Sequence, residues 1–164
     1  MLFRSDRSAA PVGRFLCDLH GEDRALYPMS DALCNALQVI NHLQDCAKDY
    51  AALDRVYLPL EWLTLEGSDC LELSNGASTP AMRRVLNRCV DGVDILLNDA
   101  RKLPGAMRHR RLAAETAVIV GVAERLTKRL RVQDPLAVRV ELGRPAFVMA
   151  ALAGLARLWL GPAR

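Results

Sequence analysis

The chain has 164 residues, 51% apolar and 25% charged; this globular composition excludes disorder, and the length suits one hydrophobic core but is short for two. The net charge of +3 is too small to indicate a nucleic-acid partner. Aromatic residues make up only 5% while Ala and Leu are plentiful, which favours helices over sheets.

Prolines mark several helix starts in the first half of the chain and beyond, because a missing N–H costs nothing at the first helical position. We expect a first helix over residues 11–20 and a second over 30–50, capped by Ser30. A short connection over residues 54–59 leads to one or two helical turns through Trp62. The prolines that precede apolar-periodic runs are Pro11, Pro59, Pro80 and Pro145.

The second half of the chain continues this helical pattern. Residues 67–78 are turn-rich and predict a surface loop, after which Thr79 caps a long helix that ends at residues 104–105. Another helix is expected over residues 107–130, and a loop around 134–135 leads to a C-terminal helix. With no strand pair and no repeat in the sequence, we predict an all-α fold. The predicted inner side of the helix after Thr79 carries Met82, Val85, Leu86, Cys89, Val93, Leu96 and Leu97. The predicted inner side of the helix over residues 107–130 carries Leu112, Val118, Val122, Leu126 and Leu130.

Further features of the sequence bear on the cellular compartment of the protein and on its contacts with membranes and anions. The five cysteines are odd in number, show no C-x-x-C spacing and are interpreted as reduced core residues; with no secretory leader they predict a cytoplasmic protein. The apolar stretch 146–160 is too short and interrupted to span a bilayer, which leaves peripheral contact with the inner face of the membrane as an alternative. The basic run 108–111 is interpreted as a solvated face, with an anion-attracting patch as the alternative.

One polar stripe along the second predicted helix is unusual. Gln38, Asn41, Asp45 and Asp49 fall within an arc about 80° wide. Asp45 and Asp49 repel each other one turn apart, so the stripe costs stability unless a positive group sits on it. Mg²⁺ fits, because it takes oxygen ligands, keeps several waters and binds one or two carboxylates plus substrate phosphates. A solvated polar face is the alternative. The opposite, packing face carries Ala36, Leu37, Ile40, Leu43 and Ala47.

The residues next to the stripe favour the metal interpretation. Arg55 and Tyr57 follow the helix closely, and a guanidinium beside a metal-bound diphosphate is the expected partner for phosphate oxygens. Asn41 and Gln44 are placed to orient a bound water or a phosphate oxygen. For Arg55 the alternative is a surface ion pair with a neighbouring aspartate, Asp54 or Asp49. The histidines are interpreted as helix-surface or loop residues: His20, His42 and His109.

These motifs resemble a known family. The run A-L-Q-V-I-N-H-L-Q-D-C-A-K-D-Y (residues 36–50), followed by R-V-Y-L-P, resembles the second aspartate-rich motif of squalene and phytoene synthases. The preceding S-A-A-P-V-G-R-F-L-C-D-L-H-G (residues 8–21) resembles the segment upstream of that motif. The variant S-D-A-L-C-N-A-L-Q is most similar to the hopanoid-pathway branch that makes hydroxysqualene from presqualene diphosphate. The resemblance runs from about Ser8 to the C-terminus and is specific around residues 31–59.

The resemblance implies a helical bundle of the isoprenoid synthase type that ionises a prenyl diphosphate, farnesyl or presqualene diphosphate. In that family two or more Mg²⁺ ions, held by two aspartate-rich motifs, draw off diphosphate, and the carbocation rearranges in an apolar tunnel. We expect no NADPH requirement. By resemblance, the metal ligands are Asp45, Asp49 and Asn41. The resemblance also gives supporting contacts to the substrate for Gln38 and Gln44, and places Arg55 and the catalytic Tyr57 near the diphosphate. It implies that the tunnel is lined by Val12 and Gly13.

The chain departs from the family pattern at its start. Nothing in it matches the first aspartate-rich motif, and residues 1–7 do not match the family's approach to the P-V-G segment. We therefore expect a single partial domain over residues 1–164, with the N-terminal helices of the bundle missing and half of the cation cage absent. One hypothesis is an isoprenoid synthase. The other is a non-catalytic helical fragment or partner-binding module, whose exposed apolar surface would lead it to self-associate or to bind a complementing N-terminal chain. Whether hydroxysqualene, squalene or phytoene is the product stays open.

Overall fold

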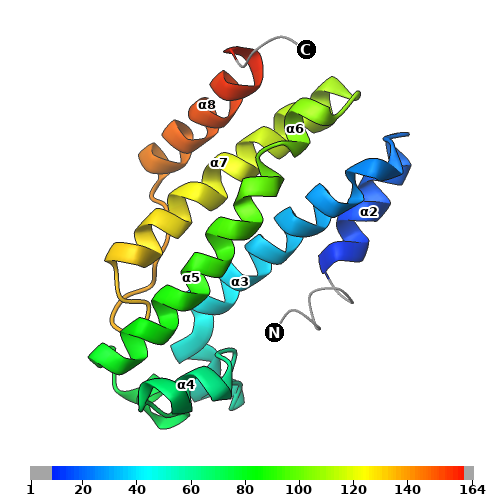
Figure 1. The fold of residues 1–164 in the computed structure, drawn as a ribbon. Helices are drawn as coiled ribbons and strands as arrows, with labels where there is room; N and C mark the ends of the chain where they lie inside the picture. The colour runs from blue at the N-terminus through cyan, green and yellow to red at the C-terminus, as the bar shows by residue number, and fades with distance from the viewer. Residues whose placement is uncertain (1–8, 161–164) are drawn as a thin grey trace.

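The computed structural model describes residues 9–160, and within that range it contains helices and connecting segments but no strand (Figure 1). The all-α prediction is therefore confirmed. The elements in chain order are α2 (Ala9–Leu19), the 3-10 turn η1 (Arg24–Leu26), α3 (Tyr27–Leu53), α4 (Leu60–Glu66), the 3-10 turn η2 (Cys70–Ser74), α5 (Pro80–Ala100), α6 (Leu103–Ala106), α7 (Arg110–Val132) and α8 (Arg144–Leu160).

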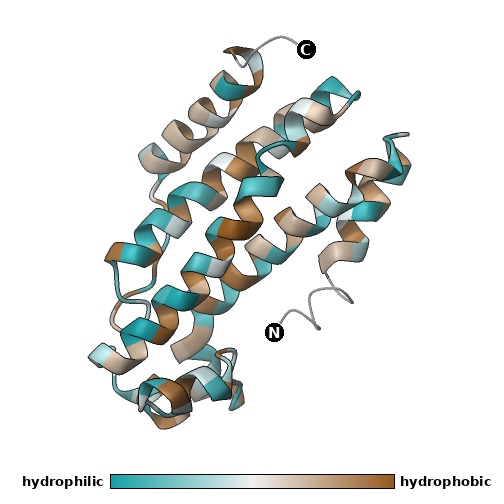
Figure 2. Ribbon diagram, in the orientation of Figure 1, coloured by the Kyte–Doolittle hydropathy of each residue, from teal (hydrophilic) through white to brown (hydrophobic). Residues whose placement is uncertain are grey.

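The long helices lie side by side in the order α8, α7, α5 and α3, with α2 against α3 and α4 at the far end (Figure 1). The core lies mainly between α3 and α5, where apolar residues of the two helices face each other (Figure 2). Ile40 and Leu43 of α3, and Val85, Val93 and Leu97 of α5, are fully buried. Burial of each such side chain contributes roughly 1.5–3 kcal/mol. The predicted inner faces of these two helices are confirmed.

Some helix boundaries differ from those predicted. α3 begins at Tyr27, three residues early, so Ser30 lies buried inside the helix and does not cap it. The reason is that η1 runs directly into α3, and Pro28 is tolerated in the first helical turn. Pro104 opens the short helix α6, while α5 has already ended at Ala100. The predicted loop 67–78 contains η2.

The inner face of α7 was only partly predicted. Leu112 and Leu130 are buried as expected, whereas Val118 and Val122 are only half-buried. A Cβ on Gly121 would overlap the Ala150 carbonyl of α8, so the two helices touch backbone to backbone. Small residues allow this approach, and they form the buried seam in place of the larger valines. The buried small residues of the seam are Ala117, Gly121, Ala150 and Gly154.

The start of α7 is fixed by a buried carboxylate. Glu22, only 6% exposed, accepts hydrogen bonds from the backbone N–H groups of Arg108 at 3.0 Å and His109 at 2.8 Å. His109 is the N-cap, and its Nδ1 accepts from the Leu112 N–H at 3.2 Å. The chain itself therefore binds the two N–H groups that precede α7 and the Leu112 N–H in its first turn.

Two properties of the whole described chain complete the fold. All five cysteines are free, as predicted. Across residues 9–160, no helix combines the length and apolarity that crossing a bilayer requires. The termini of the described chain lie at opposite sides of the bundle, with α2 beside α3 and α8 beside α7 (Figure 1).

Asp134 ties the loop before α8 to the start of α5. Its carboxylate accepts from the Ser78 N–H at 2.6 Å, the Ser78 hydroxyl at 2.5 Å and the Leu136 N–H at 3.1 Å. Burial raises the pKa of this carboxyl, but these hydrogen bonds and the charge of Arg83 outweigh burial and bring the pKa below its ordinary value. The ionised form is therefore the one that stabilises the fold.

Asp134→Asn should lower the free energy of unfolding by about 1–2 kcal/mol at pH 7, because charged hydrogen bonds to Ser78 are lost. The folded-state pKa is depressed, so the contribution of Asp134 is complete above the unfolded pKa of about 3.9 and disappears as pH falls through the lower folded value. Urea denaturation at pH 7 and pH 3 measures this. An equal difference between parent and variant at both pH values would contradict it, and Asp99→Asn serves as an exposed control.

Candidate functional site

The predicted polar stripe lies along one face of α3. Gln38, Asp45 and Asp49 are half-buried and Asn41 is exposed. Within residues 9–160, no basic side chain forms an ion pair with Asp45 or Asp49. The alternative of a surface ion pair between Arg55 and a neighbouring aspartate is therefore not observed. The two carboxylates lie one turn apart and repel each other, and neither forms an ion pair within residues 9–160.

A left-handed turn brings the residues after α3 back toward this stripe. Asp54 ends the helix with φ 50° and ψ 40°, and its N–H donates to the Tyr50 carbonyl at 3.0 Å. The Arg55 N–H donates to the Asp49 carbonyl at 3.3 Å. Such a turn satisfies the last carbonyls of a helix and reverses the chain. Tyr57 consequently lies alongside the final turns of α3.

Tyr57 holds the second carboxylate of the stripe. Its hydroxyl donates to Asp49 Oδ2 at 2.7 Å. That hydrogen bond and burial raise the pKa of Tyr57, while the nearby Arg55 guanidinium opposes them. The phenol therefore stays protonated at neutral pH and fixes the orientation of Asp49. Asp49, Tyr57 and Arg55 form one connected polar cluster at the C-terminal end of α3.

His42 belongs to the same cluster, which was not predicted. Its ring stacks on the Tyr57 ring with 4.0 Å between centroids and 2° between planes. The half-buried imidazole therefore supports the phenol that orients Asp49, in place of lying at the helix surface. The spacing of His42, Asp45 and Asp49 (i, i+3, i+7) places them on one helix face and is the signal that points to this role.

Gln44 is directed elsewhere. Its amide nitrogen donates to the carbonyl of Val140, which lies in the segment between α7 and α8 and is fully buried. The amide donor thus satisfies a buried backbone carbonyl, and the contact of Gln44 with a bound water or diphosphate stays a prediction. The physical reason is that the 133–143 segment packs against this side of α3.

Val12 and Gly13 lie on α2, away from the two aspartates. A Cβ on Gly13 would lie 2.5 Å from Ser30 Oγ and 2.7 Å from Cys34 Sγ, so this glycine permits close approach of α2 to α3. Val12 is 58% exposed. The Ser30–Cys34 turn precedes Asp45 by about 16 Å along the helix axis. The structure therefore assigns Gly13 to helix packing and leaves Val12 on the surface.

The oxygen ligands of the stripe fit part of a magnesium site. Within the part of the chain that the structure describes, no three His, Cys, Asp or Glu side chains come together as a metal site. Asp45 and Asp49 offer two carboxylates, and exposed Asn41 adds an amide oxygen on the same face. Mg²⁺ commonly takes only one or two carboxylates, with waters and substrate phosphates as the remaining ligands. The donor set therefore fits Mg²⁺ shared with a substrate, and does not form a complete protein cage.

Comparison with known proteins identifies the family of the chain. The family model for squalene/phytoene synthases matches residues 5–147. Hydroxysqualene synthase of Rhodopseudomonas palustris is 42% identical over 148 residues, which cover 90% of this chain and 51% of that protein. Hydroxysqualene synthase of Zymomonas mobilis is 42% identical over 149 residues, covering 88% of this chain and 50% of the relative.

A solved structure supports the fold. The crystal structure of squalene synthase HpnC from Alicyclobacillus acidocaldarius superposes with a TM-score of 0.64 at 27% sequence identity, covering 97% of this chain and 48% of that one. The isoprenoid synthase fold expected from the resemblance is thereby confirmed. The chain spans about half the length of the curated relatives it matches.

Proposed function

Because the chain belongs to the squalene/phytoene synthase family, we propose that its Asp45–Asp49 face binds the diphosphate of a prenyl substrate together with Mg²⁺, in squalene or hopanoid biosynthesis. Farnesyl and presqualene diphosphate are the proposed substrates. The observation that carries the proposal is the pair of carboxylates on α3 that no basic residue of the described chain neutralises, one of them held by Tyr57 at 2.7 Å. Such a pair is suited to a cation from solution.

The chain's own residues would orient the bound diphosphate. Bound Mg²⁺ supplies the positive charge that neutralises a departing diphosphate. Tyr57 keeps the Asp49 carboxylate in one orientation, and the stacked His42 limits movement of the phenol. Arg55 is exposed beside Tyr57, where a guanidinium reaches phosphate oxygens with two parallel hydrogen bonds. The proposal assigns no step to NADPH.

Completion of the site would come from a further protein segment. Two carboxylates on one helix leave the opposite side of a bound diphosphate without protein ligands. Beside α3, helix α2 exposes an apolar stripe at helical spacing, a surface suited to packing. The proposed occupant is a complementing segment that carries the missing ligands, or a second copy of this chain. The exposed apolar residues of the stripe are Val12, Phe15, Leu16 and Leu19.

Calorimetric titration of the purified chain with a non-hydrolysable farnesyl diphosphate analogue tests the proposal. With Mg²⁺ present we expect saturable binding, and with EDTA in place of Mg²⁺ we expect it to vanish, because two bare carboxylates repel a diphosphate. Binding of equal affinity in EDTA would contradict the proposal. Absence of binding in both conditions would instead favour a non-catalytic, partner-binding module.

That second function is favoured by the exposed stripe of α2. It predicts self-association or binding of an apolar dye at this surface. Light scattering behind size-exclusion chromatography, with Phe15→Gln and Leu19→Gln against the parent chain, measures it. A strictly monomeric parent that binds no dye would contradict the partner-binding function.

A further inference from the structure

One side of α8 is apolar along the whole helix. α8 lies at one edge of the row of helices and packs against α7 (Figure 1), and most of its residues are apolar (Figure 2). After Arg144 its one charged residue is Arg157, whose guanidinium turns toward α7 and donates to Glu124 at 2.7 Å. A continuous exposed apolar face indicates an interaction surface, unlike apolar residues scattered singly. The outer face of α8 is formed by Val148, Met149, Leu152 and Leu160, which are between 52% and 84% exposed.

The part of the chain that contains α7 and α8 is cationic. Residues 107–160 hold ten Lys or Arg against four Asp or Glu, whereas residues 9–106 hold nine against fourteen. The small net charge of the whole chain, +3, conceals this division. A strong charge asymmetry between two parts of one chain indicates that the cationic part meets an anionic partner.

α7 and α8 run antiparallel along their contact. Gly121 of α7 approaches Ala150 of α8, and one turn earlier on α7 Ala117 approaches Gly154. Lys128 lies two turns after Gly121 and therefore shares the face of α7 on which α8 packs. Because the two helices are antiparallel, this exposed lysine lies beside the start of α8.

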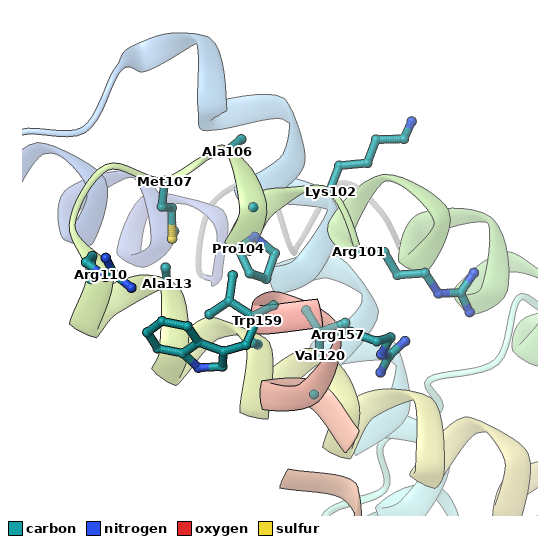
Figure 3. A pocket seen from close by; sticks show the side chains of 14 residues that line it. Arg101, Lys102, Pro104, Ala106, Met107, Arg110, Ala113, Val120, Arg157 and Trp159 are labelled. Carbon is teal, nitrogen blue, oxygen red and sulfur yellow. The ribbon is translucent and has the colours of Figure 1, made fainter. Parts of the chain in front are cut away.

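Exposed arginines accompany Lys128 at the two ends of α8. Arg144 is the first residue of the helix. At the other end the Arg110 guanidinium lies 4.7 Å from the centroid of the Trp159 ring (Figure 3). Within residues 9–160, none of these three cations forms an ion pair. Basic residues and an aromatic ring beside an apolar helix face are typical of helices that lie in a membrane interface.

We propose that the outer face of α8 binds the surface of an anionic lipid bilayer, with the helix lying along that surface. The apolar side chains enter the boundary between head groups and acyl chains, while Lys128, Arg144 and Arg110 contact lipid phosphates. A nucleic acid does not fit, because the outer face offers no polar group to phosphates or bases. A second copy of the chain fits poorly, since two cationic faces repel each other. None of the residues of the Asp45–Asp49 face takes part.

Co-sedimentation with lipid vesicles in EDTA tests the proposal. We expect binding to phosphatidylcholine vesicles that contain phosphatidylglycerol, much weaker binding to pure phosphatidylcholine, and release by salt, which screens the attraction. Lys128→Gln combined with Arg144→Gln should lower the partition coefficient about tenfold or more, because each basic residue near an anionic surface contributes about fivefold. Lys48→Gln combined with Arg84→Gln, which removes two exposed cations of α3 and α5, should bind like the parent chain.

An apolar variant tests the helix face itself. Met149 and Leu152 are both more than half exposed, so Met149→Gln combined with Leu152→Gln should keep the fold. We expect this variant to lower the partition coefficient about tenfold or more, because two side chains no longer leave water on binding. Phe15→Gln combined with Leu19→Gln is the matched control on the exposed stripe of α2, and it should bind like the parent chain. Circular dichroism checks the fold of each variant.

Four results would overturn the proposal. The first two are absence of binding to vesicles that contain phosphatidylglycerol, and equal binding to both kinds of vesicle. The third is unchanged binding of the Met149/Leu152 variant. The fourth is a dimer of the parent chain, seen by light scattering, that the Met149/Leu152 variant no longer forms, because the outer face of α8 would then belong to a contact between two copies.

Discussion

Replacing both Asp45 and Asp49 with asparagine is expected to weaken Mg²⁺-dependent binding of a farnesyl diphosphate analogue by about 100-fold or more. Even the outer partners of metal ligands contribute 10–100-fold, and Asp45 and Asp49 are the two proposed carboxylate ligands themselves. Asparagine keeps the shape but removes both negative charges, so the attraction to a divalent cation is lost. Calorimetry with and without Mg²⁺ measures the effect.

The fold itself should tolerate this double replacement. Asp45 and Asp49 repel each other one turn apart, so their neutralisation should leave thermal stability equal or slightly higher. Asp91→Asn combined with Asp94→Asn is the matched control, because it removes a similarly spaced pair on α5 that binds Arg131 at the surface. We expect the control to bind like the parent chain. Unchanged affinity in the Asp45/Asp49 variant would refute the assigned role of the stripe.

The largest loss of stability is expected from Gly154→Ala, about 3 kcal/mol in the free energy of unfolding, near the upper end of the cost of overpacking. A Cβ at this position would overlap the backbone carbonyl of Ala117. A backbone carbonyl in the middle of a helix cannot rotate aside, so α8 would have to move away from α7. Urea denaturation followed by circular dichroism measures the change.

Two other glycines provide the comparison. A Cβ on Gly92 of α5 meets no atom within 4 Å, so Gly92→Ala should stabilise the chain by about 0.5–1 kcal/mol. Gly13→Ala should cost less than Gly154→Ala, because it meets the side chains of Ser30 and Cys34, which can shift. Substitutions at surface positions usually change the free energy of unfolding by no more than about 0.5 kcal/mol. If the free energy of unfolding of Gly154→Ala lies within that range of the parent value, the close α7–α8 contact is wrong.

The sequence by itself determined the helical class, the approximate helix positions and the polar stripe. Each depends on residues near one another in the chain: apolar spacing of 3.6 residues sets the buried face of α3, and Ile40 and Leu43 lie there as predicted. Asp45 and Asp49 share a face for the same reason. The motif around these aspartates also indicated the family, which the comparisons confirm.

Only the tertiary structure decided how these helices meet. The stacking of Tyr57 on His42 requires the left-handed turn at Asp54, and the direction of Gln44 depends on Val140, which lies 96 residues away. The buried face of α7 was mispredicted because hydrophobic periodicity favours large side chains. Backbone contact between α7 and α8 selects the small ones.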